Sequence, residues 1–210
     1  EVEPRILIMT DETTVTRTPR LVLITGATGT GKSRLAHMVA NEMGFSRCVS
    51  TDTIREVLRI GRSPSDSPDL HRSSYSHGLT GDPVNDWLDA CDPIQQGISA
   101  VIDRARSQGI DLVLEGVHLV PQSNWIREWR ESGGRAIGIY VTADAEAQHR
   151  GFILERESDS YRGSERYMMA FERIRAIQRA MMERGRLAEW VRIDPLLHED
   201  PLIRVRQNLI

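Results

Sequence analysis

Short apolar runs rich in β-branched residues alternate along the chain with longer stretches of helical periodicity. The runs are LVLIT at 21–25, RCVS at 47–50, DLVLEGV at 111–117, AIGIYV at 136–141 and WVRI at 190–193. Strands that are apolar along most of their length and are separated by helices are typical of a parallel sheet covered on both faces. The pattern predicts a three-layer α/β fold built on a mostly parallel five-stranded sheet.

Apolar residues between positions 84 and 105 recur at the i, i+3, i+4, i+7 spacing of a helix that faces a core. Asp92 and Pro93 interrupt this stripe, and Gln95 follows three residues after Asp92. Aspartate is a favoured N-cap, proline suits the first helical position, and glutamine three residues later completes a capping box. We therefore expect one helix to end near Cys91 and a second to begin at Asp92.

A further amphipathic helix is expected over about residues 165–184. Its apolar side, which we assign to the core, carries Tyr167, Phe171, Ile174, Ile177 and Met181. Near the beginning of the chain, RILIM at 5–9 predicts a short edge strand, and the Thr-rich stretch through Pro19 predicts a linker. Because 210 residues fit one domain of ordinary size, we divide the chain into an extension over 1–19 and a single domain over 20–210.

The charge balance is slightly acidic, with 27 Lys and Arg against 30 Asp and Glu and a formal net charge of -3. This balance argues against a general binder of nucleic acid or of an anionic membrane. No apolar run approaches the ~18 residues of a membrane span, and the first residues lack the features of a signal peptide. Cys48 and Cys91 match no metal-binding spacing, which indicates buried thiols in a reducing compartment. We expect a cytoplasmic protein whose partner is a small anionic molecule, with neither nucleic acid nor membrane involved, and leave a homodimer open.

One segment carries most of the candidate chemistry. Gly26-Ala27-Thr28-Gly29-Thr30-Gly31-Lys32-Ser33 matches the pattern G-x-x-x-x-G-K-[ST] at every fixed position, between a predicted strand and an amphipathic helix. Glycines allow backbone N–H groups to turn inward around one anion at the N-terminus of that helix. The segment predicts a site for ATP and Mg²⁺, formed by residues 26–33 together with Arg34. Lys32 is expected to contact the terminal phosphates and Ser33 to bind the metal.

Acidic residues follow the second and third predicted strands. Asp52 lies just beyond the second strand, with Arg55 one turn later, and Glu115 ends the apolar part of the third. Ligands of open α/β sheets bind outside the carboxyl ends of the strands. We expect Asp52 to accept the proton of an attacking hydroxyl or to hold Mg²⁺, Arg55 to bind an acidic acceptor, and Glu115 to orient the metal close to that acceptor. Asp52 as a helix N-cap and Glu115 as an ordinary strand-end charge are the alternatives. His118 is a further acceptor-site candidate, although a lone histidine here is more often structural.

Two polar segments offer groups for binding the acceptor and the migrating phosphoryl group. Residues 61–83 form a long polar segment with many Pro and Gly residues, and loops of this length are usually functional or disordered. Their candidate donors to a phosphate or carboxylate are His71, Arg72, Ser73, Ser74 and Tyr75. Residues 149–167 contain four arginines, which is typical of a mobile lid over a phosphoryl-transfer site. We assign catalytic roles to Arg150 and Arg156, and a solvated helical face to Arg162 and Arg166.

Several motifs together resemble the P-loop domain of 2-phosphoglycerate kinases, a branch of the small-molecule kinases that include shikimate, gluconate and nucleoside monophosphate kinases. Besides the glycine-rich segment they are STDTIREVLR, LHRSSY, EGVHLVP and RYMMAFERIRAIQ. The resemblance covers about residues 20–185 and implies a P-loop kinase fold with an Arg-bearing lid. It also implies ATP-dependent phosphorylation of a hydroxyl on a small phosphorylated acid, with 2-phosphoglycerate giving 2,3-bisphosphoglycerate.

Two alternatives to this activity stay open at the level of the sequence. The same motifs would serve a kinase whose acceptor is a sugar acid, a polyol phosphate or a secondary-metabolite hydroxyl. A protein from another class, a regulator that hydrolyses ATP slowly and acts through a partner, would also need the glycine-rich segment. Consumption of ATP that an acceptor stimulates distinguishes both kinases from the regulator.

Overall fold

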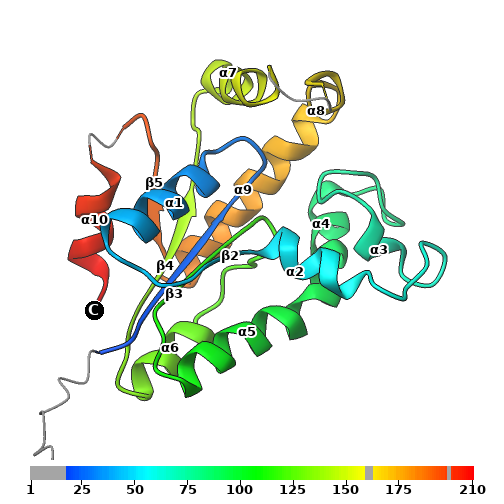
Figure 1. Ribbon diagram of the computed structural model, residues 1–210. Helices are drawn as coiled ribbons and strands as arrows, with labels where there is room; N and C mark the ends of the chain where they lie inside the picture. Colours follow the sequence, from blue (N-terminus) through cyan, green and yellow to red (C-terminus); the bar gives the residue numbers. More distant parts are fainter. Residues whose placement is uncertain (1–17, 159–162, 198–199) are drawn as a thin grey trace, which may run out of the picture.

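The computed structural model describes residues 18–158, 163–197 and 200–210. Within these residues the chain forms a sheet of five strands that all pair in parallel, in the order β2-β3-β1-β4-β5 (Figure 1). The strands are β1 (Arg20–Gly26), β2 (Cys48–Ser50), β3 (Leu112–Glu115), β4 (Arg135–Val141) and β5 (Val191–Ile193). The expected α/β fold on a five-stranded sheet is confirmed, and each strand either lies inside its expected run or extends one residue beyond it.

Helices cover both faces of the sheet and also extend beyond its carboxyl edge (Figure 1). One face packs against α1 (Lys32–Glu42) and α10 (Pro201–Asn208), and the other against α2 (Thr51–Leu58), α5 (Gln95–Ser107) and α6 (Asn124–Glu131). A third apolar cluster joins α4 (Pro83–Cys91), α7 (Glu146–Glu157), α8 (Glu165–Met169) and α9 (Phe171–Leu187). The remaining elements of the described chain are the short helix α3 (Pro68–His71) and the 3-10 turn η1 (Asp92–Ile94).

The central strand β1 is apolar at each of the four positions from Leu21 to Ile24. Successive side chains of a strand point to opposite faces of the sheet. Leu21 and Leu23 pack in the core under α5 and α6, whereas Val22 and Ile24 pack in the core under α1 and α10. All four side chains are fully buried. A strand covered on both faces has no side for polar residues, and β1 therefore carries its chemistry only at its carboxyl end.

Two helix boundaries differ from those expected. Asp92 has helical angles, φ −52° and ψ −52°, and its N–H donates to the Leu88 carbonyl. It therefore continues the turn of α4 and does not cap a new helix. The proline that follows lacks an N–H, which favours the tighter turn η1 at this point. The helix expected over 165–184 is two helices, α8 and α9, separated at Ala170.

A buried ion pair fixes the path of the polar loop that precedes α4. Arg173 of α9 lies 2.7 Å from a carboxylate oxygen of Asp86 on α4, and both residues are buried. Burial by itself would raise the pKa of Asp86, but hydrogen bonds from neighbouring donors and from Arg173 outweigh it and hold that pKa well below its ordinary value. Arg173 also donates to the backbone carbonyls of Tyr75, Ser76 and Gly81. The loop is thus tied to a helix almost a hundred residues further along the chain.

The two cysteines lie in different environments. Cys91 is buried, as expected, but Cys48 is exposed because β2 is an edge strand of the sheet. The strand expected at 5–9 lies outside the described residues. In the ranges that are described, no helix combines the length and the apolar composition that crossing a bilayer requires.

Candidate functional site

The glycine-rich segment forms the loop between β1 and α1. Gly29 and Gly31 have φ angles of 83° and 89°, in the left-handed region that favours glycine. A Cβ at Gly29 would lie 2.3 Å from Cγ1 of Ile153 on α7, so this position also needs glycine for close approach. Thr30 is fully buried, and its hydroxyl donates to the Ala27 carbonyl over 3.0 Å. The loop therefore has one compact shape at the N-terminus of α1, where the first N–H groups lack partners within the helix.

Lys32 begins α1 and lies among charged groups from three other elements. Burial lowers the pKa of its ammonium below the ordinary value, Glu115 and Asp52 act in the opposite direction, and Arg156 lowers it further. The ammonium therefore lies where acidic residues from β3 and α2 approach an arginine of α7. An added phosphate at this point would meet two cations, which favours binding of a highly charged anion.

Ser33 and Glu115 bring a hydroxyl and a carboxylate together beside the loop. The Ser33 hydroxyl donates to Oε1 of Glu115 over 3.2 Å, and Glu115 is only 7% exposed. The second oxygen, Oε2, is buried and has no hydrogen-bond partner in the part of the chain that the structure describes. A buried carboxylate oxygen without a partner is costly, and oxygen donors suit Mg²⁺ or a water bound to it. These residues therefore fit the expected magnesium site.

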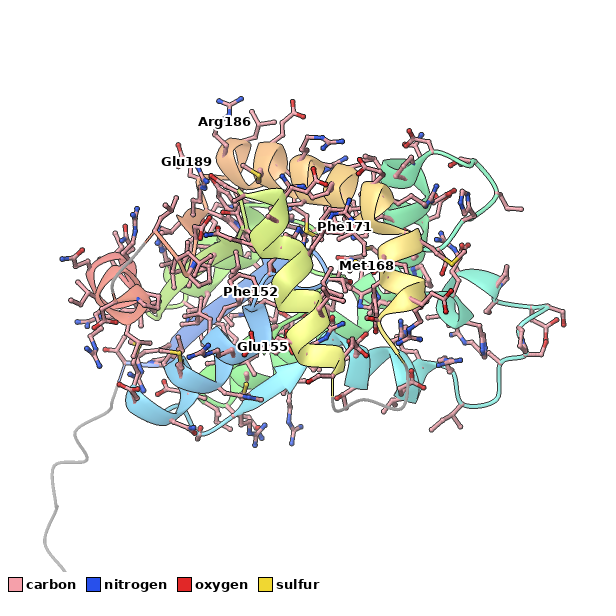
Figure 2. The ribbon with its side chains drawn as sticks, turned by 90° about the horizontal axis from the view of Figure 1, so that it is seen from above. Phe152, Glu155, Met168, Phe171, Arg186 and Glu189 are labelled. Atoms are coloured by element: carbon pink, nitrogen blue, oxygen red, sulfur yellow. The ribbon has the colours of Figure 1, made fainter. Side chains whose placement is uncertain are left out.

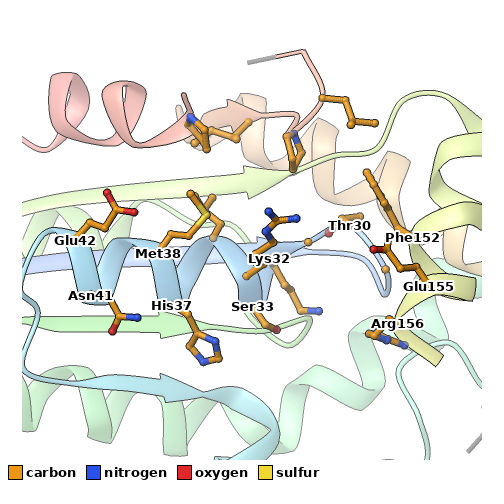
Figure 3. A pocket seen from close by; sticks show the side chains of 18 residues that line it. Thr30, Lys32, Ser33, His37, Met38, Asn41, Glu42, Phe152, Glu155 and Arg156 are labelled. Carbon is orange, nitrogen blue, oxygen red and sulfur yellow. The ribbon is translucent and has the colours of Figure 1, made fainter. Parts of the chain in front are cut away.

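A cavity of about 880 Å³ opens over the loop and one face of α1 (Figure 3). Of the residues expected to bind the nucleotide, those from Gly29 to Arg34 line it. Gly26 and Ala27 do not line the cavity. Ala27 is fully buried, and a Cβ at Gly26 would be 2.5 Å from the Thr30 hydroxyl. The remaining walls come from α1, from α7, from the end of β5 with the segment after it, and from the start of α10: Leu35, His37, Met38, Asn41, Glu42, Phe152, Glu155, Arg156, Ile193, Pro195, Leu196 and Pro201. A cavity of this volume is large enough for a nucleotide.

The wall that follows β5 was missed by reasoning from the sequence. Pro195 and Leu196 line the larger cavity two and three residues after that strand ends. The available signal was positional, because residues just beyond the carboxyl end of a parallel strand lie at the ligand-binding edge of such sheets.

A second cavity, of about 400 Å³, shares Lys32 and Arg156 with the first. Five residues expected on the acceptor side line it together, namely Asp52, Arg55, Ser73, Ser74 and Tyr75. Thr28 of the loop lines this cavity too, and the remaining lining residues are Val117, Glu157, Arg166 and Tyr167. The two cavities therefore meet at the cations beside the loop, one on the expected nucleotide side and one on the expected acceptor side.

Two other residues of the polar loop do not reach either cavity. His71 accepts from the Arg59 guanidinium and also bonds the Arg62 carbonyl. Arg72 donates to Asp69 over 2.7 Å and to the carbonyl of Asp86. Both side chains are engaged in fixing the loop itself, which leaves the cavity to the three residues that follow them.

The arginines of the expected lid also differ in placement. The helices α7 and α8 lie side by side above the carboxyl edge of the sheet (Figures 1 and 2). Arg150 lies away from both cavities, with its guanidinium 2.8 Å from Glu146 and 3.8 Å from the centre of the Phe171 ring. Arg166, expected on a solvated face, instead lines the smaller cavity and donates to the Tyr167 hydroxyl. Arg162 falls outside the described residues.

Asp52 lies in the first turn of α2 with its side chain 59% exposed. The N-cap of this helix is Ser50, whose hydroxyl accepts from the Asp52 N–H over 3.1 Å. The alternative in which Asp52 itself caps the helix is therefore wrong. Its carboxylate lies 3.5 Å from the Arg55 guanidinium and 3.9 Å from Nδ1 of His118. The Asp52 carboxylate thus lies between the Arg55 guanidinium and the His118 ring, and it lines the smaller cavity.

His118 lies buried beneath α2, with Nδ1 3.0 Å from the Thr51 hydroxyl. Burial lowers the pKa of this histidine to about 4, although Asp52 acts in the opposite direction. A histidine in the unfolded chain titrates near 6.5, so acid favours the unfolded state. The contribution of His118 to stability is therefore complete above about pH 6.5 and is lost as the pH falls towards 4.

We expect the melting temperature of the wild-type protein to fall over this pH window and that of His118→Asn to fall less. Asparagine keeps a polar group near the position of Nδ1 but does not titrate. Thermal unfolding followed by circular dichroism between pH 7 and pH 4 measures the difference. Equal slopes for the two proteins would contradict the assignment.

The sheet and the loop together define the class of protein, an α/β protein of the P-loop kinase fold. Shikimate kinase from Acinetobacter baumannii in complex with shikimate is similar in structure, with a TM-score of 0.50 and 13% identity, and the match covers 90% of each chain. The model of the Zeta toxin family matches residues 6–197. The chain belongs to this family.

Curated relatives give a closer comparison of sequence. The 2-phosphoglycerate kinase of Methanothermobacter thermautotrophicus is 35% identical over 179 residues, which cover 80% of this chain and 58% of the relative. The 2-phosphoglycerate kinase of Methanopyrus kandleri is 33% identical over 174 residues, covering 79% of this chain and 53% of the relative. The resemblance expected from the sequence motifs is confirmed. The chain spans about half the length of the curated relatives that it matches.

Proposed function

We propose that the chain is an ATP-dependent kinase that transfers the γ-phosphoryl group to a hydroxyl of a small phosphorylated hydroxy acid. The acceptor that we favour is 2-phosphoglycerate, which would give 2,3-bisphosphoglycerate. The observation that carries the proposal is the junction of two cavities at Lys32 and Arg156. Phosphoryl transfer needs the donor and acceptor groups next to each other, with cations around the migrating group, and two adjacent cavities that share two cations support this reaction.

On the nucleotide side, backbone N–H groups of the loop would bind the phosphates and Lys32 would contact the terminal ones. Ser33 and Glu115 would hold Mg²⁺, directly or through water. Bound there, Mg²⁺ would supply positive charge that neutralises the charge developing on the phosphates. The wall formed by Pro195 and Leu196 would cover the nucleoside.

On the acceptor side, Arg55 and Arg166 would bind the carboxylate and phosphate of the substrate, because guanidinium groups match both anions. Ser73, Ser74 and Tyr75 would donate further hydrogen bonds. Asp52 would take the proton of the attacking hydroxyl as the new P–O bond forms and the bond to ADP breaks. A cavity of about 400 Å³ suits an acceptor of this size.

The free thiols of Cys48 and Cys91 support a reducing, cytoplasmic setting.

The experiment that tests the proposal is a screen of phosphorylated and unphosphorylated hydroxy acids with ATP and Mg²⁺. Mass spectrometry identifies the phosphorylated product, and a coupled assay follows ADP release. We expect 2-phosphoglycerate to stimulate ADP release and to give a bisphosphorylated product in equal amount. Transfer to a different acid would assign another acceptor to the same kinase, and slow hydrolysis that no acceptor stimulates would overturn the kinase proposal.

A further inference from the structure

A histidine outside the expected site binds the phosphate-binding loop directly. His149 lies on α7, is completely buried, and its Nε2 is 2.7 Å from the backbone carbonyl of Thr28. One turn later on the same helix, Ile153 packs so closely on Gly29 that no Cβ fits between them. Two successive turns of α7 therefore contact two successive residues of the loop.

The direction of this hydrogen bond follows from the other ring nitrogen. Nη1 of Arg175 on α9 lies 3.4 Å from Nδ1 of His149. A guanidinium has donors only, so Nδ1 must accept and carry no hydrogen. The neutral ring then bears its hydrogen on Nε2, which donates to the Thr28 carbonyl. Burial also lowers the pKa of His149 below its ordinary value, which favours the neutral ring.

Arg175 is itself fixed by the loop that connects β4 to α7. Its guanidinium donates to the carbonyl of Ala143 over 2.6 Å and to the carbonyl of Asp144 over 2.9 Å. A continuous chain of contacts thus runs from α9 through Arg175 and His149 to Thr28. The same helix α7 carries Arg156, which lines both cavities.

We propose that His149 is a positioning residue that holds the phosphate-binding loop in the shape that receives the nucleotide. By engaging the Thr28 carbonyl from outside, it keeps that carbonyl turned away from the side of the loop that would receive the phosphates. It also fixes the distance between the loop and the helix that bears Arg156. The role of Arg156 in catalysis rests on the proposed function, whereas the effect on nucleotide binding does not depend on it.

The test compares two replacements of similar size. His149→Gln places an amide N–H near the position of Nε2, whereas His149→Met offers no donor. A buried carbonyl left without its donor costs enough to weaken a dependent equilibrium about tenfold. Calorimetric titration with ATP and Mg²⁺, without acceptor, should show about tenfold weaker binding to His149→Met and affinity within about threefold of wild type for His149→Gln. Gln148→Met, on the exposed side of the same helix, is the matched control and should bind as wild type does.

A spectroscopic measurement on the wild-type protein covers the case in which His149→Met does not fold. Nitrogen-15 shifts of the His149 ring should report a neutral imidazole protonated at Nε2. Protonation at Nδ1 would overturn the proposal, and so would equal ATP affinity of His149→Met and wild type. Lower melting temperatures of both variants with unchanged ATP affinity would show a merely structural role and overturn it as well. Because these readouts need no acceptor, the positioning role can stand even if no phosphoryl transfer is found.

Discussion

Replacement of Lys32 by methionine should lower kcat for phosphoryl transfer by about a thousandfold or more. The ammonium lies where the two cavities meet, so it would face the phosphoryl group during transfer. One cation aimed at the charge that develops on that group contributes a factor of about 10³ or more. Methionine keeps a long apolar side chain but has no charge. Arg47→Met, which removes an exposed cation just before β2, is the control and should leave kcat unchanged.

The same residue offers a chemical readout that is independent of catalysis, since Lys32 is the only lysine in the sequence. An amine-selective reagent can therefore modify only Lys32 and the terminal amine of the chain. The lowered pKa of Lys32 leaves more of its amine neutral and reactive. ATP with Mg²⁺ should protect Lys32 from the reagent, as judged by mass spectrometry of the peptide that contains it. Unchanged labelling, or near-normal turnover of Lys32→Met, would rule out the assignment.

The parts of the structure that the sequence predicts are those determined by neighbouring residues. Strand β1 is apolar at successive positions because it is covered on both faces, and this pattern can be recognised in the sequence itself. The loop after it has positive φ at Gly29 and Gly31. The motif fixes glycine at Gly31 but not at Gly29, where the close contact with Ile153 of α7 adds to the need for glycine. The order of strands at the carboxyl edge then brings Asp52 and Glu115 near the loop, as expected.

The parts that the sequence does not predict depend on contacts between distant segments. Ser74 lines the smaller cavity and Arg72 does not, because a buried pair between Asp86 and Arg173 fixes the loop from outside. Residue type and spacing alone do not distinguish Arg150 from the lid arginines that line a cavity. Its place against Phe171 follows from how α7 packs on α9. A pattern along one segment carries no information about such packing.

Asp52→Asn should spare ATP binding and lower the rate of phosphoryl transfer by about a hundredfold to ten-thousandfold, the usual effect of losing a general base. The amide has the same shape as the carboxylate but cannot take the hydroxyl proton. Helix α2 should be unaffected, because Ser50 and not Asp52 caps it. The ion pair with Arg55 is largely exposed on the aspartate side, so its loss should change stability little. Calorimetry with ATP and the coupled assay with acceptor measure the two effects separately.

Glu56→Gln is the matched control for this prediction. Glu56 lies on the same helix, is similarly exposed and also pairs with Arg55, but does not line either cavity within the described chain. Its replacement should leave transfer near the wild-type rate.

The dependence of the transfer rate on the Mg²⁺ concentration separates the two roles considered for Asp52, general base and metal ligand. A base acts on the hydroxyl, so its loss leaves the Mg²⁺ concentration for half-maximal rate unchanged. Loss of a metal ligand would instead raise that Mg²⁺ concentration and weaken the binding of ATP with Mg²⁺. This pair of results would exclude Asp52 as the base.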